Sequence, residues 1–290
     1  MSQGYFGAKL YINVGFTMMT LSKGLIEFDL PDSYSLRQLH AAQRQLKLDA
    51  EIVSNILQAA KVKHCLAFGT LLGAIRHQGF IPWDDDFDFF IFDEYYDLAM
   101  NVLQKYLPRH LVIHSEKNDE NYFHCWSRVK NTNTIVEYGD AYHPDNQKLK
   151  FKCLGIDLYR LNEMRVDQVE TYLQIEAEKF WNRKYATSMI SRDEYLNVPK
   201  LIRQHVEAKL SNMALNQFEK SEMVRYFCLV MNDPIKSDLF DDMHAVKFEN
   251  TSFLAPMKSH EVLRSLYGRY DVLPDWKRRN TNLTSFDYVK

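Results

Sequence analysis

The spacing of apolar residues predicts a long helix early in the chain, followed by a short buried strand. Over about residues 35–61, apolar side chains recur roughly at helical spacing. They are Leu36, Leu39, Leu46, Val53, Ile56, Leu57 and Ala60. Residues 64–68 are apolar and end at Gly69, which predicts a strand followed by a turn. A short helix is then expected over residues 71–75.

Strand and helix patterns continue to residue 159, and the pattern becomes helical after about residue 165. The elements predicted between them are a strand over 86–91, a helix over 95–106 and strands over 111–114, 122–130, 134–138 and 154–159. Ser191 and Glu194 have the spacing of a capping box, and residues 201–230 are expected to be rich in helix. A short strand is also expected within residues 10–19.

These patterns predict an α+β protein, with a small mixed β-sheet flanked by helices and a helix-rich C-terminal part. We expect an N-terminal extension over residues 1–34 and a sheet-containing core over residues 35–164. Residues 165–290 are expected to pack on this core as one unit, because no Pro- or Gly-rich linker separates the two parts.

Composition and charge narrow the class of substrate. The 290 residues are 46% hydrophobic and 26% charged, an ordinary globular composition. The formal net charge of -2 gives no overall attraction to nucleic acid or to an anionic membrane. A phosphate-bearing substrate would therefore be held locally, by metal ions and a few Arg or Lys side chains. No CxxC pair, secretory signal or membrane-spanning segment is recognised, so a cytoplasmic protein without a zinc site is expected.

Four aspartates, Asp84, Asp85, Asp86 and Asp88, form an acidic cluster within five positions. Like charges this close repel one another, and burial beside apolar residues raises the cost further. On a strand, Asp86 and Asp88 would point to the same face with Cα atoms roughly 6.5–7 Å apart. Carboxylate oxygens favour Mg²⁺ or Mn²⁺, so a metal site at Asp86 and Asp88 is expected.

Two alternatives to a Mg²⁺ or Mn²⁺ site were weighed for the acidic cluster. A solvated acidic turn is the usual fate of a charge run, but the interleaved Phe87, Phe89 and Phe90 argue against it. A calcium loop of the EF-hand type needs Gly at its sixth position and Glu at its twelfth. Counted from Asp84, those positions hold Phe89 and Tyr95, which excludes such a loop.

Residues between the predicted strands supply candidate phosphate contacts. Gly69 lets a backbone approach a ligand closely, and the following helix N-terminus offers N–H groups to phosphate, with a hydroxyl from Thr70. Arg76 could bind a phosphate oxygen or pair with a nearby aspartate, and the sequence leaves both open. His77 is expected to be a hydrogen-bonding residue rather than a catalyst.

Asp157 is a lone acid in an apolar strand, where a carboxylate needs a partner. If that strand lies beside the strand of Asp88, Asp157 would complete a carboxylate triad. It could then bind the metal or accept the proton of an attacking hydroxyl.

The segment from Gly69 to Asp88 resembles the signature of the LicD family, which includes the fukutin-related transferases, nearly residue for residue. The resemblance is close over about residues 36–160 and looser over 245–280, and no recognised motif covers residues 1–30 or 165–240. The looser part consists of Phe248-Glu249, Pro256, Leu263, Tyr267-Gly268, Leu273-Pro274 and Arg278.

The resemblance implies a nucleotidyltransferase-like fold and transfer of a phospho-alcohol, phosphocholine first among them, from a CDP-activated donor to a hydroxyl of a cell-surface glycan or glycolipid. A lipid-linked acceptor would bring the protein to the inner face of the membrane. The implied metal and catalytic residues are Asp86, Asp88 and Asp157, with Mg²⁺ or Mn²⁺. The implied substrate-binding residues are Gly69, Thr70, Arg76, His77 and Trp83.

Two rival functions and two departures from the family pattern accompany this expectation. A nucleotidyltransferase attaching a nucleoside monophosphate to a small molecule or sugar phosphate would use the same metal site. A non-catalytic glycan- or nucleotide-binding relative would keep the fold alone. Phe68 stands where a small residue is common, and Arg269-Tyr270-Asp271 replaces a frequent Gly-Asp-Tyr. Both departures concern the substrate rather than the metal site.

Overall fold

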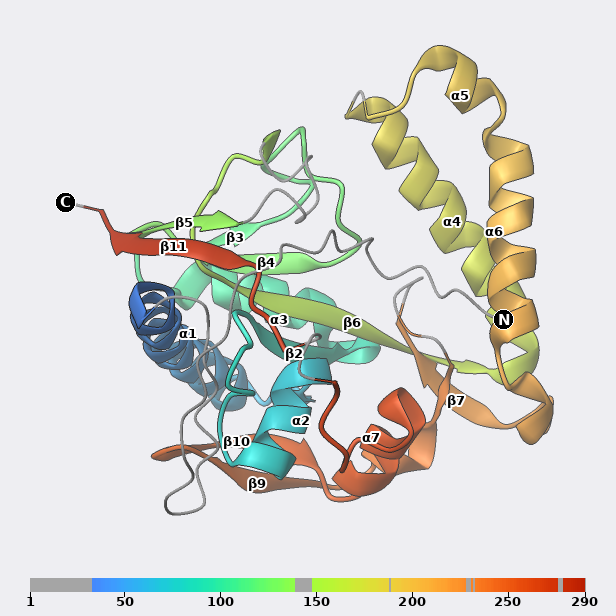
Figure 1. Ribbon diagram of the computed structural model, residues 1–290. Coiled ribbons are helices and arrows are strands. Elements are labelled where there is room, and N and C mark those ends of the chain that lie inside the picture. Colours follow the sequence, from blue (N-terminus) through green and yellow to red (C-terminus); the bar gives the residue numbers. More distant parts are fainter. Residues whose placement is uncertain are drawn as a thin grey trace.

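The computed structural model describes residues 33–138, 148–187, 189–227, 231, 233–275 and 279–289 (Figure 1). The strand expected within residues 10–19 lies outside these residues, as does nearly all of the N-terminal extension. Within them the chain forms a mixed sheet with helices around it, so the α+β prediction is confirmed. No helix in this part of the chain is long and apolar enough to cross a membrane.

The main sheet is mixed because one central pair of strands is parallel. Its order is β1 (His64–Leu66), β2 (Phe87–Phe92), β6 (Gly155–Arg165), β4 (Ser127–Asn131) and β3 (Leu111–His114). β2 and β6 are parallel, and the other neighbours are antiparallel. β7 (Met223–Tyr226) pairs with the C-terminal half of β6, and β8 (Ile235–Lys236) pairs with β7.

Helix α1 (Ser33–Ala59) confirms the first predicted helix. Its buried face is formed by residues three or four positions apart, which line one side of an α-helix. They are Leu39, Ala42, Leu46, Ala50, Val53 and Leu57, all without exposed surface. The helix ends where Lys61 adopts a left-handed φ of 55° and the Val62 N–H donates to the Leu57 carbonyl, a C-terminal capping geometry.

Helix α2 (Phe68–His77) begins earlier than predicted. The sequence placed Gly69 in a turn and the helix over residues 71–75, but Gly69 and Thr70 lie in its first turn. The chain turns at Phe68, whose φ of 39° lies in the left-handed region. Farther along, a Cβ added to Gly73 would lie 2.5 Å from the carbonyl oxygen of Gly79, so only glycine lets the helix pack this closely on the following loop.

The remaining predicted strands are present with changed bounds or partners. β4 begins at Ser127, five residues later than expected, and β6 continues to Arg165. β5 (Thr134–Tyr138) pairs with β11 (Leu283–Tyr288), more than 140 residues away, and they form a separate two-stranded sheet. Helix α3 (Asp93–Tyr106) follows β2 directly.

The part after residue 165 contains helices and strands. Its helices are α4 (Val169–Ala186), α5 (Arg192–Leu196), α6 (Val198–Asn212) and α7 (Ser259–Tyr267), with 3₁₀ turns at Val166–Gln168, Leu215–Gln217 and Ser237–Phe240. The capping box of Ser191 and Glu194 is confirmed. The helix-rich prediction for residues 201–230 is confirmed up to Asn212 and is wrong for residues 223–226, which form β7 with Val224 and Tyr226 buried.

Figure 1 shows how these elements surround the sheet. α4 and α6 pack on one another and extend beyond the end of β6. α7 lies against α2, and the hairpin of β9 (Met243–Phe248) and β10 (Thr251–Pro256) also lies on that side. β2 is buried along its whole length. The side chains of Phe248 and Phe253 pack against Phe87, with ring centroids 5.4 and 5.1 Å away, so the strand that carries Asp88 is firmly held.

Candidate active site

Strands β2 and β6 bring Asp88 and Asp157 side by side. The strands are parallel neighbours, and Asp88 is the direct register partner of Asp157. Adjacent strands lie about 4.8 Å apart, and paired residues point to the same face. Asp157 was expected to join the other acids only if its strand lay beside that of Asp88. The structure meets this condition.

Asp86 and Asp88 differ in their surroundings. The strand was predicted to begin at Asp86 but begins at Phe87, so Asp86 lies in the preceding loop. Its side chain is exposed, whereas Asp88 is only 4% exposed. Asp86 reaches solvent, but protein atoms packed around its carboxyl group reduce its hydration and raise its pKa well above the ordinary value. The charges of Asp88 and Asp84 raise this pKa further.

Two carboxylate oxygens of the acidic cluster are buried without a hydrogen-bond partner: Oδ2 of Asp84 and Oδ1 of Asp88. Burial, followed by the charge of Asp85, raises the pKa of Asp84 to about 7. Burial, followed by the charges of Asp157 and Asp84, raises the pKa of Asp88 well above its ordinary value. A buried carboxylate oxygen without a donor is costly, and a bound proton or a bound cation would stabilise this pair.

Asp157 already has donors from the protein. Arg128 donates from Nε to Oδ1 at 2.7 Å, and Trp126 donates from Nε1 to Oδ2 at 2.8 Å. The hydroxyl of Tyr159 also donates to Oδ2, at 3.0 Å. Arg128 is itself buried and forms an ion pair with Asp157 across the β4–β6 register. The partner that a lone acid in an apolar strand needs is therefore Arg128, a residue that the sequence did not identify.

Asp85 connects residues 83–86, the acidic loop before β2, to the C-terminal segment that begins β11. Its Oδ2 accepts the hydroxyl of Thr281 at 2.7 Å and the backbone N–H groups of Asn282 and Leu283 at 2.7 and 2.6 Å. Leu283 begins strand β11. The role of Asp85 in the structure is thus to hold the start of this strand against the acidic loop.

Gly69 and Thr70 hold the acidic residues from the first turn of α2. A Cβ added to Gly69 would lie 3.0 Å from Oδ2 of Asp84, so a side chain there would push on that carboxylate. Thr70 is only 1% exposed, and its hydroxyl oxygen accepts the backbone N–H of Asp88 at 2.9 Å. Thr70 was expected to contact a diphosphate; in the structure its oxygen fixes the backbone of Asp88.

Arg76, His77 and Trp83 lie together near the end of α2. Arg76 Nη1 donates to the carbonyl of Tyr270 at 2.8 Å, and no carboxylate of the described residues pairs with Arg76. Burial, and then the charge of Arg76, lowers the pKa of His77 to about 4, so this imidazole is neutral. The rings of His77 and Trp83 are in edge contact at 6.4 Å, and the guanidinium of Arg279 lies 5.7 Å from the Trp83 ring centroid.

Tyr267, at the end of α7, is affected by the charges of both the acidic cluster and Arg76. Its side chain is 43% exposed. Its crowded surroundings, and then the charges of Asp88, Asp84 and Asp86, raise its pKa, while the charge of Arg76 lowers it. In the sequence, Tyr267 stood out only as part of the looser C-terminal pattern, and no role was expected for it.

The residues fit a divalent cation in donor type and in charge. Asp84 and Asp88 each have an unpartnered buried oxygen, and Asp86 adds an exposed carboxylate. Asp157 fits less well, because Arg128 already neutralises it. No three His, Cys, Asp or Glu side chains in the part of the chain described here are already arranged as a complete metal site. A cation would therefore be bound through adjustment of these carboxylates or with ligands from a substrate.

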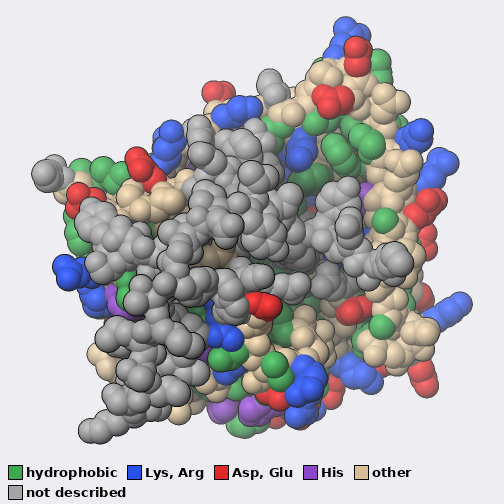
Figure 2. Space-filling view, in the orientation of Figure 1, with side chains coloured by type: hydrophobic (Ala, Val, Ile, Leu, Met, Phe, Trp, Pro, Cys, Tyr) green, Lys and Arg blue, Asp and Glu red, His purple; other side chains and the backbone are tan. Residues whose placement is uncertain are grey.

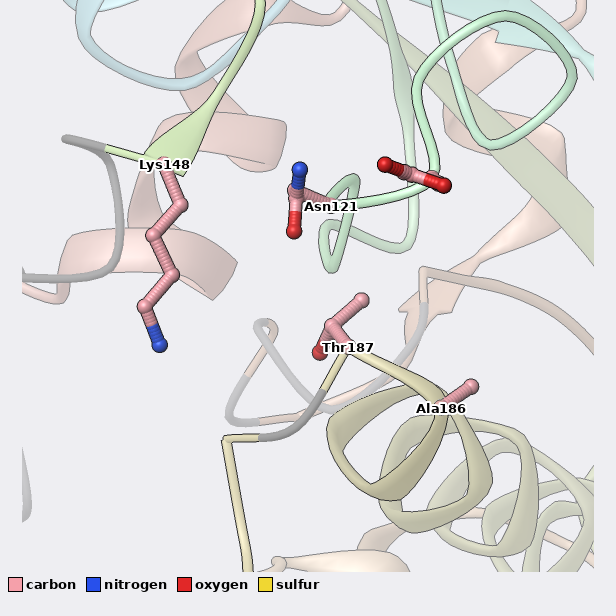
Figure 3. Close-up of a pocket in the computed structure, with 5 residues that line it drawn as sticks. Asn121, Lys148, Ala186 and Thr187 are labelled. Carbon is pink, nitrogen blue, oxygen red and sulfur yellow. The ribbon is translucent and has the colours of Figure 1, made fainter.

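A separate hollow of about 390 Å³ lies away from these residues (Figure 3). It is lined by Glu120, Asn121, Lys148, Ala186 and Thr187. None of them belongs to the acidic cluster or to the group around Arg76. On the described part of the face in Figure 2, acidic and basic side chains are interspersed, as expected for a net charge near zero. The charge that bears on function is therefore local.

Comparison with known proteins identifies the segment that carries these residues. Residues 61–170 match the family model described as LicD/FKTN/FKRP, nucleotidyltransferase domain. The chain carries a LicD-family domain. This LicD domain contains Gly69, Thr70, Arg76, Trp83, the acidic cluster and Asp157, whereas Tyr267 and Arg279 lie outside it.

Several relatives match parts of the chain, and three of them are described here. The lipopolysaccharide cholinephosphotransferase LicD of Haemophilus influenzae is 50% identical over 42 residues, which is 14% of this chain and 16% of the relative. The human ribitol 5-phosphate transferase FKRP is 47% identical over 51 residues, 18% of this chain and 10% of FKRP. The protein RP689 of Rickettsia prowazekii, which is uncharacterized, is 28% identical over 149 residues, 45% of this chain and 50% of the relative. The chain thus spans half or less of the length of each relative.

Proposed function

We propose that this chain transfers a phospho-alcohol from a CDP-activated donor to a hydroxyl of a cell-surface glycan, with phosphocholine as the first group to test. The LicD domain supports this, as do a cholinephosphotransferase and a ribitol 5-phosphate transferase among the relatives. The observation that carries the proposal is the pair of buried, unpartnered carboxylate oxygens of Asp84 and Asp88 in a cluster whose pKa values are all raised.

Asp86 and Asp88 would hold Mg²⁺ or Mn²⁺, with Asp84 beside them. When bound, such a cation neutralises charge on the transferred phosphoryl group and on the leaving nucleotide. Thr70 fixes the backbone of Asp88, and the Phe-rich core fixes strand β2, so the carboxylates keep their positions. Asp157, the third acid expected to bind metal, would have to give up a hydrogen bond from Arg128 or Trp126 to do so.

Asp157 is better placed to accept a proton. In the proposed reaction the acceptor oxygen forms a bond to the phosphorus that carries the alcohol, and the bond from that phosphorus to the CMP oxygen breaks. The proton of the acceptor hydroxyl passes to a carboxylate. Asp157 accepts three hydrogen bonds shorter than 3.1 Å and a longer fourth one, from Nη2 of Arg128 at 3.5 Å. The proton would take the site of this longest bond, one of roughly four lone-pair sites of a carboxylate.

The test is release of CMP from CDP-choline in the presence of Mg²⁺, with and without the change Asp88→Asn. We expect the variant to lose at least about a hundredfold in rate, because the cation loses a ligand. It should stay folded, since the change removes a buried repulsive charge. The matched control is Asp271→Asn, at a side chain that is 68% exposed. A wild-type rate in Asp88→Asn would contradict the assigned role.

The alternative activity is attachment of a nucleoside monophosphate to a small molecule or sugar phosphate, as the name of the family's domain suggests. The two reactions differ in which phosphorus faces the nucleophile, so the acidic cluster suits both. CMP release supports phospho-alcohol transfer, and pyrophosphate release supports nucleotidyl transfer. A protein that binds no divalent cation by calorimetry would instead be a non-catalytic glycan- or nucleotide-binding relative.

The proposed acceptor sets the proposed location. A glycan or glycolipid acceptor made in the cytoplasm would be modified there, and a lipid-linked acceptor would hold the protein at the inner face of the membrane.

A further inference from the structure

Arg76 and Arg279 come from distant parts of the chain and border the same pair of contacting rings, His77 and Trp83. Nε of Arg76 lies 3.5 Å from Nδ1 of His77, and the guanidinium of Arg279 lies 5.7 Å from the ring centroid of Trp83. Arg76 is near the end of α2, and Arg279 lies in the segment that leads into β11. The charge of Arg279 contributes to lowering the pKa of Arg76, after the larger effect of burial. Both side chains are half-buried. Two guanidinium groups placed together and partly withdrawn from water are stable only with an anion or strong acceptors nearby.

Among the residues that the structure describes, the acceptors that face Arg76 are neutral. Its Nη1 donates to the carbonyl of Tyr270, and its Nε points to the neutral His77 ring at 3.5 Å. No carboxylate within the described residues forms an ion pair with it. The guanidinium of Arg76 has five N–H donors, of which one engages a carbonyl and one faces the His77 ring. Its other donors can therefore bind an anion.

Arg279 is oriented by contacts of its own. Its Nε donates to the carbonyl of Pro274 at 2.8 Å, and its guanidinium stacks near the ring of Trp83 at 5.7 Å. The adjoining residues 281–283 are held by the carboxylate of Asp85. The acidic loop, which supplies both Trp83 and Asp85, therefore fixes the position of Arg279.

The two arginines are adjacent to the acidic cluster without being part of it. Arg76 and Thr70 are six residues apart on α2, about 9 Å along the helix axis, and Thr70 contacts Asp88 directly. The hydroxyl of Tyr267 lies within the electrostatic range of both groups. A ligand that reached from the acidic cluster to the arginines would meet bound cation at one end and guanidinium groups at the other.

We propose that Arg76 and Arg279 form an anion subsite that binds a phosphate group of the substrate, with Arg279 as a specificity-determining residue delivered by the C-terminal segment. Phosphate is the anion of choice, because the planar guanidinium fork matches its oxygens and because a metal-binding acidic cluster lies alongside. That the bound phosphate belongs to the CDP-activated donor rests on the function proposed above. That the two arginines bind an anion does not.

The test is binding of inorganic pyrophosphate by calorimetry, first in EDTA and then with Mg²⁺. In EDTA, Arg279→Ala and Arg76→Ala should each weaken binding by about tenfold to a hundredfold, the loss expected for charge-assisted hydrogen bonds. Arg279→Lys keeps the charge but loses the fork, so its affinity should fall between those of Arg279→Ala and the unchanged protein. The control Arg192→Ala removes an exposed arginine of α5, away from the subsite, and should leave affinity unchanged.

The outcomes separate this proposal from the proposed function. Wild-type affinity in Arg279→Ala, in protein with an unchanged unfolding midpoint, would overturn the subsite. An equal loss in Arg192→Ala would show only general charge attraction and would overturn it as well. Asp88→Asn should keep its affinity in EDTA and lose only the gain caused by Mg²⁺. If Mg²⁺ has no effect on any variant while the arginine effects hold, the metal role fails and the subsite stands.

Discussion

At the scale of single residues, Thr70 shows how one hydroxyl joins two parts of the site. Its oxygen accepts the N–H of Asp88, a donor in a strand that is buried along its whole length. The same residue lies in the first turn of α2, the helix whose last turn carries Arg76. The Gly-Thr pair was expected to serve a phosphate, but the contact in the structure is internal. The two roles make different predictions for a substitution.

Replacing Thr70 with Val keeps its shape and removes the acceptor. The buried N–H of Asp88 would be left without a partner, so we expect the free energy of unfolding in urea to fall by about 1–3 kcal/mol. Affinity for Mg²⁺ should fall too, since Asp88 is less well fixed. Thr70→Ser, which keeps the oxygen, is the control and should stay near wild type. Unchanged stability with weaker donor binding alone would instead mean that Thr70 contacts the substrate.

At the scale of elements, Asp85 ties the acidic loop to strand β11. A second contact between elements is made by Phe68, where the chain turns into α2 with a positive φ. Its ring packs edge-on against Phe90, Tyr159 and Phe227, at 4.9, 5.0 and 6.5 Å. These contacts offset the strain that a non-glycine residue incurs in this conformation. The departure of Phe68 from the family pattern is thus accommodated by the aromatic core beneath the site.

Replacing Asp85 with Ala would leave the hydroxyl of Thr281 and two backbone N–H groups without their acceptor. We expect a loss of about 2–4 kcal/mol in the free energy of unfolding, measured in urea. Hydrogen exchange should rise most in β11 and its partner β5. Asp271→Ala, at an exposed aspartate, is the control. A local change confined to the acidic loop, with β11 still protected, would show that the segment is held by other contacts.

Local patterns in the sequence indicated the elements and the acids, whereas pairings between distant segments were not visible in them. α1, β2 and the acidic cluster were predicted because helical spacing and clustered charge are properties of neighbouring residues. The pairing of β5 with β11 was missed, since one strand pattern does not name its partner. Arg279 was missed for the same reason, as its meeting with Arg76 depends on the path of the whole C-terminal part.

At the scale of the whole molecule, a small net charge coexists with a dense local group of acids. Asp84, Asp85, Asp86 and Asp88 all have raised pKa values in the folded protein. A carboxyl whose pKa is raised by folding favours the folded state while protonated, fully so below its unfolded pKa. That contribution is lost as the pH rises through the folded pKa, which is about 7 for Asp84.

Histidines act in the opposite direction over a different pH range, and burial lowers the pKa values of His64 and His205 as well as those of His77 and His114. The pKa values of His77 and His114 are lowered to about 4, so their contribution is complete above an unfolded value of about 6.5 and is lost as the pH falls. Above that pH they no longer change the stability. Any loss of stability between about pH 6.5 and 8 is therefore expected to come from the acidic cluster.

For the metal-free protein we accordingly expect the midpoint of thermal unfolding, Tm, to fall between about pH 6.5 and 8. Saturating Mg²⁺ should raise Tm by about 3–8 °C, and more at pH 8 than at pH 6.5, because a cation competes with protons for the same oxygens. In Asp88→Asn both the fall with pH and the gain from Mg²⁺ should shrink, since one of the repelling carboxylates is gone. Calorimetric scans in EDTA and in Mg²⁺ at several pH values measure this. A Tm that rises with pH in EDTA, or a Mg²⁺ effect unchanged by Asp88→Asn, would mean that the acidic cluster neither destabilises the fold nor binds the cation.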